Sequence, residues 1–186
     1  TELADSALRE VRKVYSGRIE KLTMWCDFDF WVPIPSEELK VSIRNKLNIP
    51  QGKMVFLASG NFVPRKQFDK LIEVFVGLQH REDFLLIVAG HGNETYTKML
   101  KSLAAPLIKQ GKAMLHPYVR EEGLRDLYWS SDLYVSVASD EGGPVTVMEA
   151  MGCGLPVLST LVGETTERME KHSVGKLVSE KNYNEW

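Results

Sequence analysis

The sequence predicts an open, doubly wound α/β sheet of about six parallel strands with helices on both faces. From Met54 onward, short apolar runs of strand length alternate with amphipathic stretches of helix length. Runs such as Phe84–Ala89 (FLLIVA) are apolar without alternation, which is typical of strands buried on both faces of a parallel sheet. Because parallel strands connect through right-handed crossovers, the intervening helices are expected to cover both faces.

The elements follow one another in order. The expected strands are buried apolar runs: Met54–Ser59, Phe84–Ala89, Ala113–His116, Leu133–Val137, Pro156–Ser159 and Lys176–Val178. The expected helices carry apolar residues at helical spacing between the strands: Lys66–Leu78, Glu94–Gln110, Glu121–Ser130, Val145–Cys153 and Thr165–Lys171. Ligands of such sheets bind outside the carboxyl ends of the strands, so four loops are expected to form any site: Gly60–Arg65, Gly90–Asn93, His116–Arg120 and Ser139–Pro144.

The first fifty residues have a different pattern. We expect a helix over Ala4–Val14, a strand over Arg18–Met24 and a helix over Ser36–Leu47. The segment between them (WCDFDFWVP) holds four aromatic residues that either pack in the core or cover a surface of absent chain: Trp25, Phe28, Phe30 and Trp31. The sequence therefore predicts an N-terminal or interdomain segment over 1–50 and a ligand-binding domain over 51–186.

Composition excludes several classes of protein. The 186 residues are 44% hydrophobic and 26% charged, which is ordinary for a globular domain. Lys and Arg number 23 against 25 Asp and Glu, a net charge of −2, so no basic field favours nucleic acid as a partner. No apolar run reaches the ~20 residues of a membrane-spanning helix, and Thr1–Arg9 lacks signal-peptide features. Two distant cysteines, Cys26 and Cys153, together with histidines outside metal-binding spacings, favour a cytoplasmic protein without a metal.

The residues that point to chemistry gather in Ser139–Val157 (SDEGGPVTVMEAMGCGLPV). A strand ends there, Gly142 and Gly143 form a turn, and a helix opens at Val145–Thr146. Such a helix N-terminus presents free N–H groups and a positive dipole end, which suits a phosphate.

Two acids bracket this helix end. Glu141 precedes the helix, and Glu149 lies inside it among apolar residues, where a carboxylate needs hydrogen-bond donors. Lys66 opens the first helix after the first strand and can supply a cation to the same edge, a role for which Arg65 competes. Two acids and a phosphate site suit a ligand that carries both hydroxyls and phosphate.

These segments together resemble the C-terminal domain of retaining GT-B glycosyltransferases of family GT4. Glu141 and Glu149 match its E-x7-E motif, and EAMGCGLPVLST looks like its EAMAxGxPVVxT. The stretch GNFVPRKQFD resembles GRLxxxKGxD with Lys66 on the family lysine, and LLIVAGHG, LHPYV, VGETTE and VGKLV resemble further family segments in the same order. The resemblance runs from about Lys53 to Val178 and implies a Rossmann-like sheet that is one half of a GT-B fold.

The resemblance also implies roles for particular residues. The family binds a nucleotide-sugar, UDP- or GDP-linked, and transfers the hexosyl group with retention to a glycan or lipid-linked acceptor, without a cofactor or metal. Glu149 would accept the ribose hydroxyls, Glu141 would touch the donor sugar, and Tyr118–Val119 would lie beside the base. The diphosphate would be held by Lys66 and the loop and helix end around it: Gly60, Asn61, Gly142, Gly143, Val145 and Thr146. Glu141 and Lys66 are thus the expected catalytic pair.

The chain departs from the family in several places. Asn61 stands where the family has an arginine, and Gly143–Pro144 replace Phe-Gly, so one backbone donor is lost at the proline. The family's N-terminal acceptor domain and its closing C-terminal helix are missing, so the chain is expected to be inactive alone. Membrane association of the parent protein, peripheral to the bilayer, stays open.

Two other functions compete with this hypothesis. A standalone, non-catalytic nucleotide- or phosphate-binding module is the alternative, and Asn61 motivates it. An NAD-dependent oxidoreductase ranks last, because Gly90-His91-Gly92 lacks the third glycine of the dinucleotide-binding fingerprint.

Overall fold

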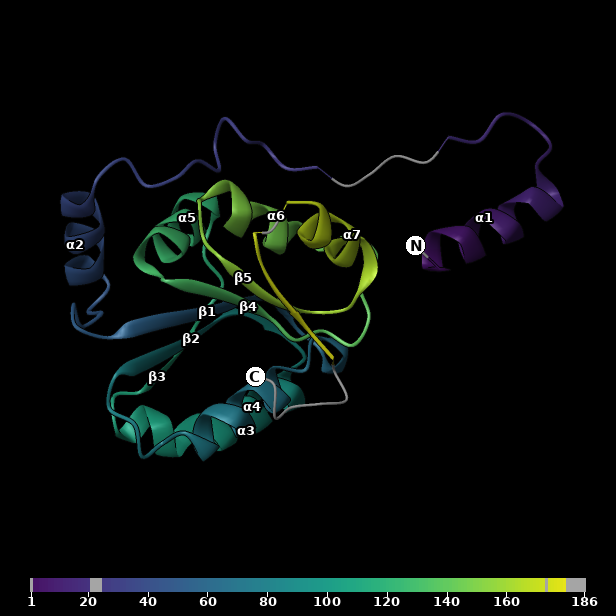
Figure 1. The fold of residues 1–186 in the computed structure, drawn as a ribbon. Coiled ribbons are helices and arrows are strands. Elements are labelled where there is room, and N and C mark those ends of the chain that lie inside the picture. Colours follow the sequence, from purple (N-terminus) through teal and green to yellow (C-terminus); the bar gives the residue numbers. More distant parts are fainter. Residues whose placement is uncertain (1, 21–24, 173, 180–186) are drawn as a thin grey trace.

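The computed structural model describes residues 2–20, 25–172 and 174–179. Within them, six strands form one parallel sheet in the order β3-β2-β1-β4-β5-β6 (Figure 1). The predicted doubly wound sheet is therefore confirmed. The strands are β1 (Met54–Phe62), β2 (Phe84–Gly92), β3 (Ala113–His116), β4 (Leu133–Ser136), β5 (Val157–Thr160) and β6 (Gly175–Val178).

Helices cover both faces of the sheet, as predicted (Figure 1). One face carries α3 (Phe68–Gly77) and α4 (Glu94–Lys109), and the other carries α5 (Glu121–Ser130), α6 (Val145–Gly152) and α7 (Gly163–His172). Successive strand residues alternate between the two faces, so Leu57 packs toward α5 and α6 while Ala58 packs toward α3 and α4. Both side chains are fully buried, which explains the unbroken apolar runs.

The carboxyl ends of β1 and β2 run further than predicted, to Phe62 and Gly92. Gly60 and Gly90 pair in register, with φ of +146° and +155°. A Cβ at Gly90 would lie 1.9 Å from the Gly60 carbonyl oxygen, so only glycine allows the two strand ends to approach this closely.

The helix predicted to begin at Lys66 begins two residues later. Lys66 instead closes a short 3-10 turn, η1 (Pro64–Lys66). Gln67 has φ of +50°, which interrupts the helical path before α3 starts at Phe68. Lys66 is therefore held by the β1–α3 loop rather than by a helix.

The N-terminal expectations hold in part. Helices form at α1 (Glu2–Val14) and α2 (Glu37–Lys46), and α1 covers neither face of the sheet (Figure 1). The strand predicted over Arg18–Met24 is wrong at residues 18–20, which form no ladder with any described strand, and residues 21–24 lie outside the described residues. A strand needs a neighbour to pair with, and hydrophobic pattern alone does not supply one.

The core-packing prediction holds for two of the four aromatic residues before α2. Trp31 is buried against Tyr128, with ring centroids 5.6 Å apart. Phe30 is half-buried, and the Arg125 guanidinium carbon lies over its ring, 4.2 Å from the centroid of that ring. The core-packing prediction is wrong for the other two, since Trp25 is 76% exposed and Phe28 is 56% exposed.

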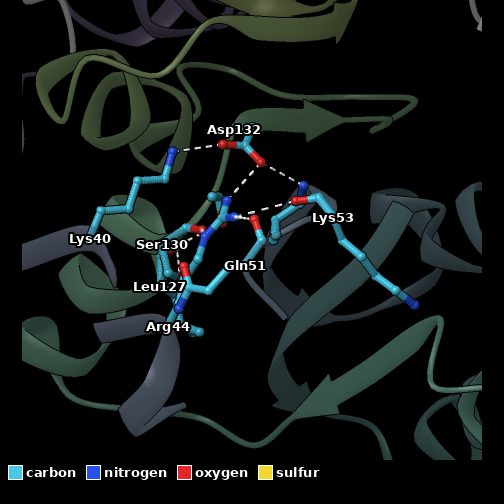
Figure 2. Close-up of polar contacts among 9 residues, drawn as sticks. Lys40, Arg44, Gln51, Lys53, Leu127, Ser130 and Asp132 are labelled. Carbon is cyan, nitrogen blue, oxygen red and sulfur yellow. Dashed lines mark hydrogen bonds and ion pairs between the residues drawn. The ribbon is translucent and has the colours of Figure 1, made fainter. Parts of the chain in front are cut away.

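A buried arginine links α2 to the rest of the domain by hydrogen bonds and an ion pair (Figure 2). Arg44 is 5% exposed and donates to Asp132 Oδ2 at 2.7 Å and to the Ser130 carbonyl oxygen at 2.8 Å. Its Nη1 donates to the carbonyls of Gln51 (3.1 Å) and Lys53 (3.3 Å). Burial raises the pKa of Asp132, but Lys40, the Val55 N–H and Arg44 outweigh it and leave that pKa below its usual value. This network lies where β1 and β4 begin, at the edge of the sheet opposite their carboxyl ends.

Candidate functional site

A cavity of about 170 Å³ opens where β1 and β2 end. Six of the residues predicted to bind a ligand line it: Gly60, Asn61, Tyr118, Val119, Thr146 and Glu149. They come from β1, the loop after β3, and α6, which are far apart in sequence. The carboxyl edge of the parallel sheet brings them together, as expected for a doubly wound fold.

Lys66 and Glu141 form an ion pair beside this cavity. Lys66 Nζ lies 2.5 Å from Glu141 Oε1, and their side chains are 14% and 9% exposed. A Cβ placed on Gly60, a lining residue, would lie 3.6 Å from Lys66 Nζ, so the ammonium group sits next to the cavity wall. The three groups predicted to converge, Lys66, Glu141 and Glu149, therefore share one edge of the sheet.

A second cation meets the same carboxylate oxygen. Arg65 Nη1 lies 2.7 Å from Glu141 Oε1 and also donates to the Asp140 carbonyl oxygen at 3.0 Å. The Arg65 carbonyl in turn accepts from the Ser139 N–H at 2.9 Å, which ties the loop after β1 to the loop after β4. Two cations on one nearly buried carboxylate leave positive charge available to an added anion.

The N-terminus of α6 lies between the two acids. Pro144 is its N-cap residue and supplies no side-chain hydrogen bond, so the first N–H groups of the helix have no side-chain cap. Thr146 lines the cavity, whereas Gly142, Gly143 and Val145 do not. The start of α7 backs this loop closely, because a Cβ on Gly163 would lie 2.0 Å from the Glu141 carbonyl oxygen.

Glu149 is a half-buried acid at the cavity. Burial raises its pKa above the usual value, a hydrogen bond from Tyr128 opposes that shift, and the charge of Glu121 adds to it. The Tyr128 hydroxyl donates to Glu149 Oε2 at 2.9 Å. The expectation that an acid in this apolar helix needs a donor is confirmed.

A second, larger cavity of about 520 Å³ adjoins the first and shares Gly90, His91 and Tyr118 with it. His91 and Tyr118 meet edge to face with ring centroids 4.8 Å apart. Tyr118 is 64% exposed, so its ring is available for contact with a planar ligand group. The two cavities give an extended site along the ends of β1, β2 and β3.

Sequence reasoning did not name several residues of this site, among them three with polar side chains. Ser59 and His91 line the first cavity, and Tyr128 contacts Glu149 from behind the lining. His91 lies near the end of β2, within the stretch Gly90–Asn93 that the sequence analysis predicted as a loop of the site, so the sequence carried a signal for it. Nothing in the sequence indicated a site role for Tyr128, because its spacing on α5 is that of an ordinary core residue.

The arrangement suits an anion with hydroxyl groups. Lys66, Arg65 and the start of α6 can hold phosphate oxygens, and Glu149 can accept hydrogen bonds from hydroxyls. Within the described residues, no three His, Cys, Asp or Glu side chains gather as a metal site. In the same part of the chain, no helix combines the length and apolar character needed to cross a membrane.

The chain is similar to known proteins in sequence and in fold. The chain is 31% identical over 135 residues to mannosylfructose-phosphate synthase of Agrobacterium fabrum, covering 69% of this chain and 29% of the relative. Its fold matches sucrose-phosphate synthase of Thermosynechococcus elongatus with a TM-score of 0.77 at 18% identity, covering 97% of this chain and 45% of that one. It matches Anabaena HepE in complex with UDP and glucose with a TM-score of 0.70 at 21% identity, covering 83% and 41%. The chain thus spans less than half the length of the curated relatives it matches.

A family model decides among the hypotheses. The model described as glycosyl transferases group 1 matches residues 40–186, which include both cavities and the Glu141–Glu149 segment. The match favours neither a standalone nucleotide-binding module nor an oxidoreductase. By its sequence and by the fold that carries its site, the chain belongs to the glycosyl transferases group 1 family.

Proposed function

We propose that this chain is the nucleotide-sugar-binding domain of a retaining glycosyltransferase of the GT-B type, family GT4. The observation that carries the proposal is the cavity at the ends of β1 and β2, which Glu149 lines, with the Lys66–Glu141 ion pair beside its wall at Gly60. The parent enzyme would transfer a hexosyl group from a UDP- or GDP-sugar to a glycan or lipid-linked acceptor. A UDP-bound relative of the same fold supports the nucleotide class.

The nucleotide has a definite place in this proposal. Glu149 accepts the ribose hydroxyls, and the base lies by Tyr118 and Val119, near His91. The diphosphate reaches Lys66 and the start of α6. The first cavity is smaller than the ~300 Å³ of a usual ligand pocket, and the adjoining cavity supplies the remaining room.

Charge exchange accompanies binding in this proposal. Glu141 Oε1 holds both Lys66 and Arg65 in the unliganded chain. A diphosphate carries more negative charge than one carboxylate and competes for both cations. Glu141 is then released toward the donor sugar, while the cations face the leaving diphosphate, on which charge builds as the glycosidic bond breaks.

The acceptor belongs to a part of the parent protein outside this chain. We propose that an N-terminal domain forms the opposite wall of the cleft, because the chain spans less than half of its relatives. Transfer by this chain alone is therefore expected to be absent or very slow, while nucleotide binding is retained.

Isothermal titration calorimetry with UDP, GDP and ADP tests the proposal. We expect at least one nucleotide to bind with a dissociation constant below about 1 mM, equivalent to ~4 kcal/mol. Glu149→Gln should weaken that binding, whereas the matched control Glu73→Gln, at an exposed position of α3, should not. Absence of heat with all three nucleotides at millimolar concentration would contradict the proposal.

A further inference from the structure

Three hydroxyl groups meet in the core next to Glu149. Tyr128 and Tyr134 are 0% and 1% exposed, and Ser59 is 5% exposed. Ser59 Oγ lies 3.3 Å from the Tyr128 hydroxyl and 3.2 Å from the Tyr134 hydroxyl. The Tyr128 hydroxyl reaches Glu149 Oε2 at 2.9 Å, so a continuous chain of hydroxyls ends on this acid.

Proton accounting gives the last contact of this chain a direction. Each hydroxyl has one proton to donate. The Tyr134 hydroxyl reaches the Ser59 carbonyl oxygen at 3.2 Å, and the Ser59 hydroxyl can donate to either tyrosine oxygen. Tyr128 then donates either to Glu149 or to the Thr146 carbonyl oxygen at 3.1 Å. An ionised carboxylate is the stronger acceptor and is the nearer one, so the proton of Tyr128 is directed to Glu149.

This contact occupies one of the two oxygens of Glu149. Among the described residues, no protein donor reaches Oε1, and the Glu149 side chain lines the cavity. Oε1 is thus left for a ligand. Tyr128 also favours the charged form of the acid, since its hydrogen bond lowers a pKa that burial raises. The other titratable groups that act on Glu149 or feel its charge are Glu121 on α5, Tyr134 on β4 and Cys153, the residue that follows α6.

We propose that Tyr128 is a positioning residue that fixes the Glu149 carboxylate at the cavity and thereby sets the preference for ribonucleotides over 2′-deoxyribonucleotides. The inference rests on the proposed function, since it assigns Glu149 to the ribose. Without the Tyr128 hydroxyl, the carboxylate loses its internal anchor. It can then rotate or take up a proton, and its hydrogen bonds to the two ribose hydroxyls weaken.

The competing role for Tyr128 is packing alone. Its ring meets Trp31 at 5.6 Å and 86°, and Tyr134 at 5.6 Å and 59°. Phenylalanine preserves these ring contacts and removes only the hydroxyl. A packing role predicts equal effects on ribo- and deoxyribonucleotides, whereas a positioning role predicts unequal ones.

The experiment measures the affinities of UDP and 2′-deoxy-UDP for the chain and for its Tyr128→Phe variant by calorimetry, with GDP and 2′-deoxy-GDP as a second pair. We expect Tyr128→Phe to weaken the ribonucleotide by about tenfold and the deoxyribonucleotide by less, so that the preference shrinks. Tyr96→Phe is the matched control. The Tyr96 hydroxyl also donates to a carboxylate, Asp69 at 2.7 Å, but on the opposite face of the sheet, so the preference should not change.

The outcomes separate the two proposals. A wild-type chain that binds no nucleotide overturns both. A wild-type chain that prefers the ribonucleotide, with the same preference in Tyr128→Phe, overturns the role of Tyr128 and leaves the proposed function standing. Additive losses in Tyr128→Phe and Glu149→Gln combined would likewise contradict a shared action through the carboxylate.

A second measurement needs no variant, in case Tyr128→Phe does not fold. Carbon NMR of the Glu149 carboxyl group in the wild-type chain reports its ionisation at pH 7. An ionised carboxyl group agrees with Tyr128 as its donor. A protonated one at pH 7 contradicts the proposal, because the charged carboxylate that Tyr128 is proposed to position would then be absent.

Discussion

Glu149 shows how a single side chain can be constrained by fold and function at once. It lies in α6 between buried apolar residues, yet it lines the cavity and has a dedicated donor in Tyr128. A carboxylate in such surroundings has a raised pKa because burial disfavours its charge.

The raised pKa gives opposite pH dependences for binding and stability. Nucleotide affinity should fall as pH drops from 7 toward the ordinary titration range of a glutamate, because protonated Glu149 is a weaker acceptor for the ribose hydroxyls. The unliganded chain should gain stability over the same range, since the folded state binds this proton more tightly than the unfolded state. Calorimetric titrations across this pH range measure the first effect, and thermal unfolding measures the second.

Glu149→Gln is the control for both effects. It removes the titrating group, so the remaining pH dependence is that of the nucleotide phosphate and of other residues. Identical pH profiles in the wild type and Glu149→Gln would show that Glu149 does not titrate in this range.

Lys66 should act on phosphate and not on the nucleoside. Lys66→Ala removes the ammonium group beside Gly60 and is expected to weaken UDP by about tenfold, with little change for uridine. Lys70→Ala, at an exposed position of α3, serves as the control. Equal losses for UDP and uridine, measured by titration, would remove Lys66 from the phosphate site.

Asn61 offers a gain-of-affinity test. It lines the cavity and is exposed, at the position where the GT4 resemblance has an arginine. Asn61→Arg adds a cation next to Lys66 and should strengthen UDP binding by about three- to tenfold. Unchanged or weaker binding in a folded variant would contradict a phosphate contact at position 61.

At the scale of elements, the Arg44 network that holds α2 and the candidate site lie at opposite edges of the sheet. The site lies at the carboxyl ends of β1 and β2, whereas Arg44 ties α2 to the beginnings of β1 and β4 (Figure 2). Asp132 accepts from Arg44 on this network and also from the Val55 N–H at 2.8 Å. Because the two regions share no residue, stability and binding should be separable by mutation.

Arg44→Met tests this separation. It removes the side-chain donor of the Ser130 carbonyl, leaves Asp132 with only Lys40 and the Val55 N–H, and should reduce the free energy of unfolding by about 3 kcal/mol in urea titrations. UDP affinity of the folded variant should be unchanged. Lys46→Ala, which removes an exposed ion pair with Asp126, should have little effect on stability. Loss of UDP binding in folded Arg44→Met would show that the two edges are coupled.

At the scale of the whole molecule, the sequence predicted the sheet because alternating apolar runs and amphipathic helices leave few topologies. It also predicted Glu149, Lys66 and Thr146 at one edge, since carboxyl ends of parallel strands meet there. What it missed depends on contacts between distant residues. The Tyr128–Glu149 hydrogen bond and the pair of cations on Glu141 join separate loops, and no periodicity records such contacts.

The failed expectations have the same origin. Residues 18–20 of the strand expected from Arg18 pair with no described strand. Trp25 and Phe28 are exposed although their aromatic side chains suggested core packing. Lys66 sits in a 3-10 turn because Gln67 adopts a left-handed conformation, which a helical pattern does not show. The hydrophobic pattern along the chain was enough to predict most helices and strands. Which residues these elements contact depends on tertiary packing, which the pattern does not show.

A crystal structure of the chain with UDP tests the central claim most directly. The account predicts the ribose hydroxyls on Glu149, the uracil near Tyr118 and the diphosphate next to Lys66, with the Lys66–Glu141 ion pair opened. UDP bound elsewhere, or in the cavity with its phosphates turned away from an unbroken Lys66–Glu141 pair, would contradict it.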